Sequence, residues 1–131
     1  MKLNPDCIRA VLLAVEEVCD MENFFSSIDD IEQVKGDFSE NEILYHARQC
    51  DLAGMFYNYR ADIEGNFSVT DLSPKGHEFL ANIREDTIWN NVKAVSAKVG
   101  SKSLNALAQI ATSVISEIIK AQLGLPPTQQ P

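Results

Sequence analysis

Apolar residues near the start of the chain recur at the spacing of an α-helix. The helix start is marked by Asn4-Pro5-Asp6: Asn caps free amides, Pro fits the first turn and Asp complements the helix dipole. The apolar positions that follow are Ile8, Val11, Leu12, Val15 and Cys19. This pattern predicts a first helix over about residues 5–19.

The pattern over residues 20–38 is ambiguous. Ile28, Ile31 and Val34 repeat every three residues between Ser27 and Gly36, which suits a short helix over 28–34. A strand in this interval fits the same residues, so both alternatives stay open.

A clearer helix pattern covers residues 40–53. Ser39 and Glu42 have the spacing of a capping box, and Gly54 is suited to end the helix in a left-handed conformation. The expected apolar stripe is formed by Ile43, Leu44, Ala47, Cys50 and Leu52.

Strand-type residues follow over 55–61 and 66–72, on either side of a polar turn that contains Gly65-Asn66. This arrangement predicts a β-hairpin. Ser73-Pro74 starts another helix, in which Gly76 leaves room for a neighbouring backbone. The apolar face of this helix rotates after Asp86, so the helix either bends near residues 85–87 or changes its packing partner there.

A last helix is predicted over 103–122, after a break at Gly100-Ser101. Its apolar residues cover an arc of roughly 220°, wider than the ~100° stripe of a helix packed on one side. We therefore expect a second subunit to cover part of it and a homodimer to form, with contacts from Leu107, Ile110, Val114 and Ile118. The tail, 124–131, has little apolar content and is predicted to be disordered.

The order of these elements predicts an α+β, mainly α fold. A helix that ends at a Gly turn and leads into a hairpin is the layout of a winged-helix domain. In that layout 40–53 corresponds to the recognition helix and the hairpin to the wing. The predicted organisation is a core over 1–85, a helical extension with the dimer contacts over 86–123, and the tail.

Four segments also carry a family resemblance: MKLNPDCIR, SENEILYHARQCDLAGM, DLSPKGHEFLANIREDTIWNNVK and GSKSLNALAQIATSVI. Together they resemble the bacterial and prophage family called domain of unknown function 2513, over about residues 1–123. The most specific parts are Tyr45-His46 and the segment from Leu72 to Trp89. The resemblance implies a phage or prophage source and a winged-helix-like fold. It implies no established activity.

Charge is distributed unevenly along the chain. The net charge is −8, with 5 Lys or Arg against 15 Asp or Glu in residues 1–72 and 6 against 4 in residues 73–131. The first part would repel a polyanion, because neutralising phosphates requires clustered cations. No apolar run approaches the ~20 residues of a membrane span, and no signal peptide is evident. We therefore expect a cytoplasmic protein.

Candidate catalytic and metal-binding residues are few. His46 and Cys50 lie four residues apart on one predicted helix, and with His77 they would make three zinc ligands. The paired-cysteine signature of zinc sites is missing, and the three cysteines suit buried positions in a reducing compartment. Gly76-His77-Glu78 lacks a nucleophile or a paired carboxylate beside it. The sequence predicts no cofactor, no metal and no enzyme.

Two binding hypotheses remain. An acidic face could meet a basic groove of a host or phage protein, and one concrete form is an inhibitor that occupies a host protein's nucleic-acid site. Its residues are Asp29, Asp30, Glu32, Asp37, Glu40 and Glu42. The alternative is a DNA-binding transcriptional regulator that uses Asn41, Arg48, Gln49, Arg60 and Lys75. We favour the protein partner because this surface offers few cations to phosphates.

Overall fold

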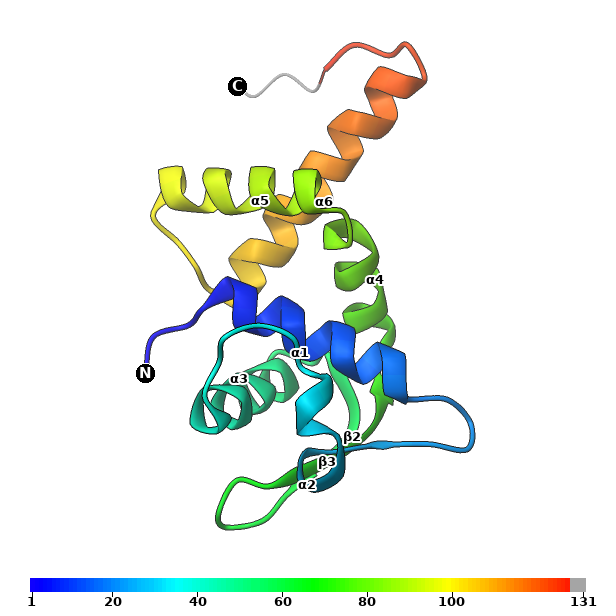
Figure 1. Ribbon diagram of the computed structural model, residues 1–131. Helices are drawn as coiled ribbons and strands as arrows, with labels where there is room; N and C mark the ends of the chain where they lie inside the picture. Colours follow the sequence, from blue (N-terminus) through cyan, green and yellow to red (C-terminus); the bar gives the residue numbers. More distant parts are fainter. Residues whose placement is uncertain (128–131) are drawn as a thin grey trace. The chain divides into compact units, whose positions relative to one another are not determined.

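A computed structural model describes residues 1–127 and divides the chain into two compact units, Met1–Leu80 and Ala81–Pro131. The fold is α+β and mainly α, as the sequence predicts. In the first unit the elements follow the order α1 (Pro5–Val18), β1 (Phe25–Ser26), α2 (Ser27–Asp30), the 3-10 turn η1 (Ile31–Gln33), α3 (Glu40–Leu52), β2 (Phe56–Ala61), β3 (Phe67–Leu72) and the start of α4 (Pro74–Ile83) (Figure 1).

The helix starts and ends are those expected from the sequence. The side chain of Asn4 accepts a hydrogen bond from the Asp6 amide at the start of α1. At the start of α3, Ser39 and Glu42 exchange both bonds of a capping box. Gly54, with φ +79°, ends α3 in the left-handed region.

In the ambiguous interval the residues around Ile28 and Ile31 are helical, and a short strand precedes them. Phe25 and Ser26 form the strand β1, and α2 and η1 follow at once. The three strands make an antiparallel sheet in the order β1-β3-β2, with Phe25 opposite Val69 and Tyr59 also opposite Val69. The β2–β3 hairpin confirms the predicted one to within a residue at each end.

The core of the first unit lies where α1, α3 and the sheet pack together. Its completely buried side chains include Ile8, Val11, Leu12, Val15, Phe25, Ala47, Cys50 and Met55. One prediction for α3 is wrong: Leu52 is 72% exposed and lies outside the apolar stripe, whereas His46 is buried within it. Leu52 faces solvent because, at about 100° per residue, it lies roughly 200° around the helix from Cys50 and so points away from the buried stripe.

Gly76 explains how α4 meets the end of α3. A Cβ atom at this position would lie 2.1 Å from the carbonyl oxygen of Met55, so no other residue fits without movement of the backbone. The amide of Ser73 donates to the same carbonyl at 2.9 Å. The close approach expected from the sequence is therefore confirmed.

The second unit contains α5 (Asp86–Val99) and α6 (Leu104–Gln122), which pack against each other. The helix predicted to bend or change partner near residues 85–87 is instead two helices, since α4 ends at Ile83 and α5 begins at Asp86. Gly100, with φ +73°, ends α5. Trp89, Val92, Leu104, Leu107 and Ala111 are buried. Leu107 leaves the predicted dimer contacts, because it is completely buried within its own chain. Part of the predicted disordered tail, 128–131, lies outside the described residues.

Candidate functional site

The exposed face of α3 and the hairpin border a small cleft of about 210 Å³. Asn41, Tyr45 and Arg48 line it from α3, Tyr59 and Ala61 from β2, and the turn residues Asp62–Gly65 from the hairpin tip. The guanidinium of Arg48 lies 5.5 Å from the centre of the Tyr45 ring, within the range of a cation–π contact. Two of the residues predicted for DNA binding therefore face the same cleft.

Acidic groups accompany this cleft. Asp62 and Glu64 line it directly. Partial burial raises the pKa of the Asp51 carboxyl on α3. Burial also raises the pKa of Tyr59, and the negative charge of Asp51 adds to that shift. A phosphate approaching the cleft would meet these carboxylates as well as Arg48.

The other predicted DNA-binding residues do not gather around the cleft. Lys75 donates from Nζ to the carbonyl oxygen of Ala53 at 2.9 Å, so it caps the end of α3. Arg60 is exposed on β2 and its Nε lies 3.4 Å from Oδ1 of Asn58. Gln49 is half-buried and does not line the cleft.

The predicted acidic face consists of two kinds of residue. Asp30 and Glu42 have structural partners: Asp30 accepts from the Ser26 amide at 2.9 Å, and Glu42 completes the capping box of α3. The other four are exposed and lie on α2, η1, the loop before α3 and the first turn of α3: Asp29, Glu32, Asp37 and Glu40. These four carboxylates are the ones available to a partner.

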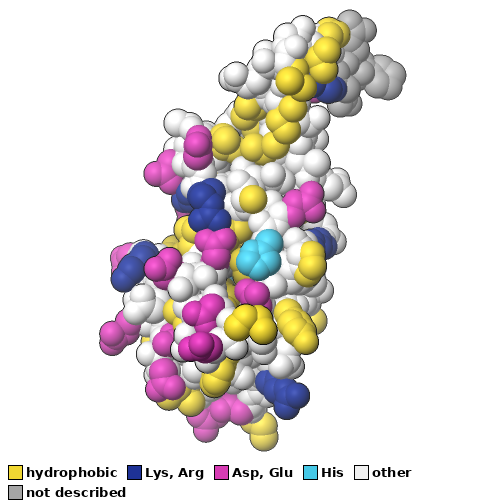
Figure 2. Space-filling model, turned by 90° about the vertical axis from the view of Figure 1, so that its right-hand side faces the viewer, with side chains coloured by type: hydrophobic (Ala, Val, Ile, Leu, Met, Phe, Trp, Pro, Cys, Tyr) yellow, Lys and Arg dark blue, Asp and Glu magenta, His cyan; other side chains and the backbone are white. Residues whose placement is uncertain are grey.

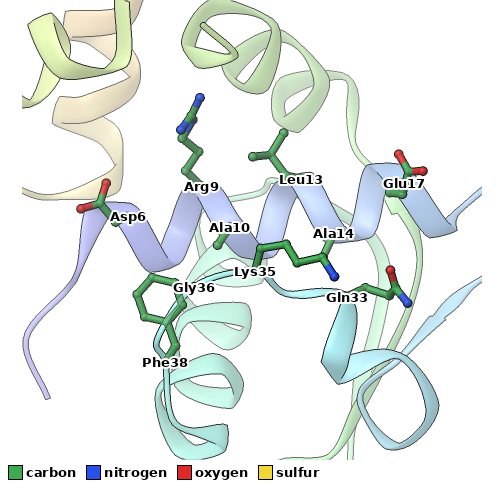
Figure 3. A pocket seen from close by; sticks show the side chains of 10 residues that line it. All are labelled: Asp6, Arg9, Ala10, Leu13, Ala14, Glu17, Gln33, Lys35, Gly36 and Phe38. Carbon is green, nitrogen blue, oxygen red and sulfur yellow. The ribbon is translucent and has the colours of Figure 1, made fainter. Parts of the chain in front are cut away.

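An open groove of about 490 Å³, which no sequence pattern had indicated, runs beside α1 (Figure 3). Ala10, Leu13 and Ala14 supply its apolar wall on α1, and Phe38 closes the opposite side. Asp6 and Glu17 lie toward its two ends, and Lys35 extends along it. The volume lies within the ~300–1,000 Å³ range of ligand sites.

Gly36 lies in the loop before α3 and shapes the side of the groove that faces α1. Its φ is +122°, and a Cβ atom there would lie 2.4 Å from the ring of Phe38. The ring therefore lies against the bare glycine, which holds it beside the groove. The alanines at 10 and 14, one helical turn apart, and the Gly36–Phe38 pair are the sequence signals for this groove.

The first unit is strongly acidic. Residues 1–80 hold 6 Lys or Arg against 16 Asp or Glu, whereas residues 81–131 hold 5 against 3. Figure 2 shows acidic side chains spread over much of one face, with few Lys or Arg among them. The acidic residues counted in the sequence are therefore exposed together on one face of the molecule.

His46 has a structural role. Its Nε2 accepts a hydrogen bond from the Asn4 amide at 2.8 Å, and Nδ1 lies 2.7 Å from the carbonyl oxygen of Glu42. The neutral ring with its proton on Nδ1 satisfies both contacts and joins α3 to the start of α1. His77 is half-exposed and lies 3.5 Å from Asp71. Within residues 1–127, no three His, Cys, Asp or Glu side chains are grouped to hold a metal ion.

The three cysteines are free thiols. Burial raises the pKa of Cys7 to about 12 and that of Cys19 to about 11, and it raises the pKa of Cys50 further. Neutral thiols of this kind are poor nucleophiles and poor metal ligands.

Comparison with known proteins places the chain in a family. The family model described as "Hypothetical protein (DUF2513)" matches residues 2–102. The chain belongs to this family. It is also 32% identical over 122 residues to an uncharacterised protein of Haemophilus influenzae, covering 91% of this chain and 99% of that relative. No solved structure matches. The family match ends just before α6. Every helix within residues 1–127 is too short or too polar to cross a lipid bilayer.

Proposed function

We propose that this DUF2513 protein is a non-enzymatic, winged-helix-like interaction module of phage or prophage type. It binds a basic surface of another protein in the host cytoplasm through its acidic first unit. A partner of this kind is a nucleic-acid-binding or defence protein, whose basic groove the acidic surface would occupy. The observation that carries the proposal is the net charge of −10 over residues 1–80, formed by 6 cations and 16 acids.

The order helix, strand, helix, helix, hairpin supports the winged-helix assignment. The electrostatics of the cleft beside α3 argue against ordinary groove reading, because carboxylates line it together with a single guanidinium. A basic protein that contacts the same surface would meet no such charge repulsion, because its charges are opposite to the carboxylates and speed association.

The groove beside α1 would accept an apolar anchor of the partner. Interfaces draw most of their binding energy from a few side chains in well-packed pockets, and surrounding charges supply specificity and speed. Asp37 follows Gly36 and precedes Phe38, so an exposed carboxylate stands next in sequence to two residues that line the groove. A basic residue next to an apolar residue on the partner would satisfy both features.

The test is affinity capture from host lysate with matched charge variants. The first variant, D29N/E32Q/E40Q, neutralises exposed acids of the predicted face; the control, E22Q/E78Q/E85Q, removes the same charge at exposed positions outside that face and outside the cleft beside α3. We expect a specific partner to be retained by the wild type and the control and to bind the first variant about tenfold more weakly. Recovery of background proteins alone, or equal loss in both variants, would contradict the proposal.

DNA binding is the second candidate, favoured by Asn41 and Arg48 facing one cleft. It predicts a gel shift with phage or host DNA that weakens steeply as salt increases and that Arg48→Ala and Arg60→Ala reduce. The absence of a shift at low salt would exclude this candidate and leave the first one intact.

A further inference from the structure

The cleft beside α3 has the size of one side chain and is too small for a whole ligand. Its volume is about 210 Å³, below the ~300–1,000 Å³ range of ligand sites. It lies within the first unit, between the exposed face of α3 and the tip of the β2–β3 hairpin. We therefore expect its occupant to be a single side chain of a larger molecule whose remaining parts stay outside the cleft.

The charges that line the cleft favour a cation as the occupant. Asp62 and Glu64 contribute two carboxylates, and Arg48 contributes one guanidinium. Oδ1 of Asp62 accepts a hydrogen bond from the Asn66 amide at 3.0 Å, which holds this carboxylate in the hairpin turn. Glu64 is exposed in the same turn. One incoming cation would balance the lining charge, whereas an anion would add to its excess of negative charge.

Two tyrosines, Tyr45 on α3 and Tyr59 on β2, also line the cleft, and both are half-buried. The Tyr59 ring stacks with Phe56 and with Phe67, with ring centres 5.9 Å and 5.4 Å apart. These contacts hold the ring in one orientation. Aromatic rings attract cations, and a planar guanidinium can in addition stack on their faces. The aromatic lining therefore favours the same kind of occupant as the charges do.

The surroundings of Tyr59 add a further negative charge. Burial raises the pKa of the Tyr59 hydroxyl, and the carboxylate of Asp51 on α3 raises it further. The positive charge of Arg48 lowers the same pKa, but by less than Asp51 raises it. The one cation of the cleft is therefore outweighed at this hydroxyl as well as in the count of lining charges.

We infer that this cleft receives one arginine side chain of the partner protein. The inference rests on the proposed function, since the arginine belongs to the basic surface that the acidic first unit binds. Arginine suits the cleft better than lysine, because its guanidinium pairs with a carboxylate through two hydrogen bonds and stacks on a ring, whereas an ammonium is a compact point charge. The fully exposed Ile63 also lines the cleft and offers an apolar contact to the methylene stem of the arginine.

The test is a titration of the isotope-labelled full chain with N-acetyl-L-argininamide, followed by two-dimensional NMR. We expect a Kd of about 1–10 mM, with the largest amide shifts over residues 41–48 and 59–65. Glu64→Gln should weaken binding about threefold or more, because it removes the exposed carboxylate of the cleft. Glu78→Gln is the matched control: it removes the same charge at an exposed position on α4 outside the cleft and should leave the Kd unchanged.

N-acetyl-L-lysinamide carries the same charge on an ammonium and should bind about threefold more weakly than the arginine compound. Equal binding of the two compounds would contradict the choice of arginine. Amide shifts that lie outside the cleft, a Kd that Glu64→Gln leaves unchanged, or no binding up to about 50 mM would overturn the site itself. Failure of the proposed function would be seen separately, because the capture experiment changes carboxylates outside the cleft and needs a host partner, whereas this titration needs none.

Discussion

Replacing His46 by alanine tests whether this residue fastens α3 to the start of α1. The imidazole is 1% exposed and bonds to Asn4 and Glu42 through its two nitrogens. Losing two hydrogen bonds removes about 2 kcal/mol, and the cavity left by the ring adds about 1–2 kcal/mol. We expect His46→Ala to lower the free energy of unfolding by about 3–4 kcal/mol.

The assay is urea unfolding followed by circular dichroism. With a slope of about 2 kcal/mol per molar urea, this loss moves the midpoint down by roughly 1.5–2 M. The control is His77→Ala, in which a half-exposed ring loses a contact with Asp71 worth less than about 1 kcal/mol. If both variants unfold at similar urea concentrations, the hydrogen bonds of His46 do not stabilise the packing of α3 against the start of α1.

Three further changes have defined outcomes. Gly76→Ala places a methyl group against the Met55 carbonyl and should cost about 2–4 kcal/mol of stability, measured by the same unfolding assay; a cost under about 1 kcal/mol would contradict this packing. Ser39→Ala removes one bond of the capping box and should cost about 1 kcal/mol, which an unchanged melting temperature would disprove. Alkylation of Cys7 and Cys50 at pH 8 should be slow in the folded protein and fast in urea, and rapid labelling of the native chain would refute their burial.

The raised thiol pKa values also give a direction for alkaline stability. The folded chain keeps the Cys7 thiol neutral up to about pH 12, whereas the thiol of an unfolded chain ionises near its ordinary value of 9.0. The stabilisation is therefore complete below pH 9 and decreases as the pH rises toward 12. Cys7→Ala should show a smaller loss of unfolding free energy between pH 8 and pH 10.5 than the wild type.

The fold was predictable wherever the signal is local. Caps, glycine stops and periodic apolar positions depend on residues within one or two turns, so Ser39, Gly54 and the hairpin turn were identified from the sequence. The short strand β1 was not separable from a helix, because two residues are too few to show a period. Its strand character comes from pairing with β3, more than 40 residues away.

The candidate sites depended on distant contacts and were predicted less well. His46 could be considered as a metal ligand from its spacing to Cys50 alone, but its partners at Asn4 and Glu42 satisfy both ring nitrogens. The groove beside α1 requires two segments that are far apart in sequence, and neither alone indicates a cavity. Lys75 looked available to DNA and is instead bound to the end of α3.

The contacts of α3 within the first unit explain its resemblance to a recognition helix without any DNA ligand. Its cap at Ser39, its stop at Gly54 and its buried face with His46 all serve the packing of the first unit. Each of them would be needed whatever the helix bound, so together they carry no information about a ligand. That information lies in the exposed side chains, where Arg48 is accompanied by Glu40 and by the carboxylates of the hairpin tip. A surface of this charge favours a basic protein over a nucleic acid, and the shape of the helix does not weigh against it.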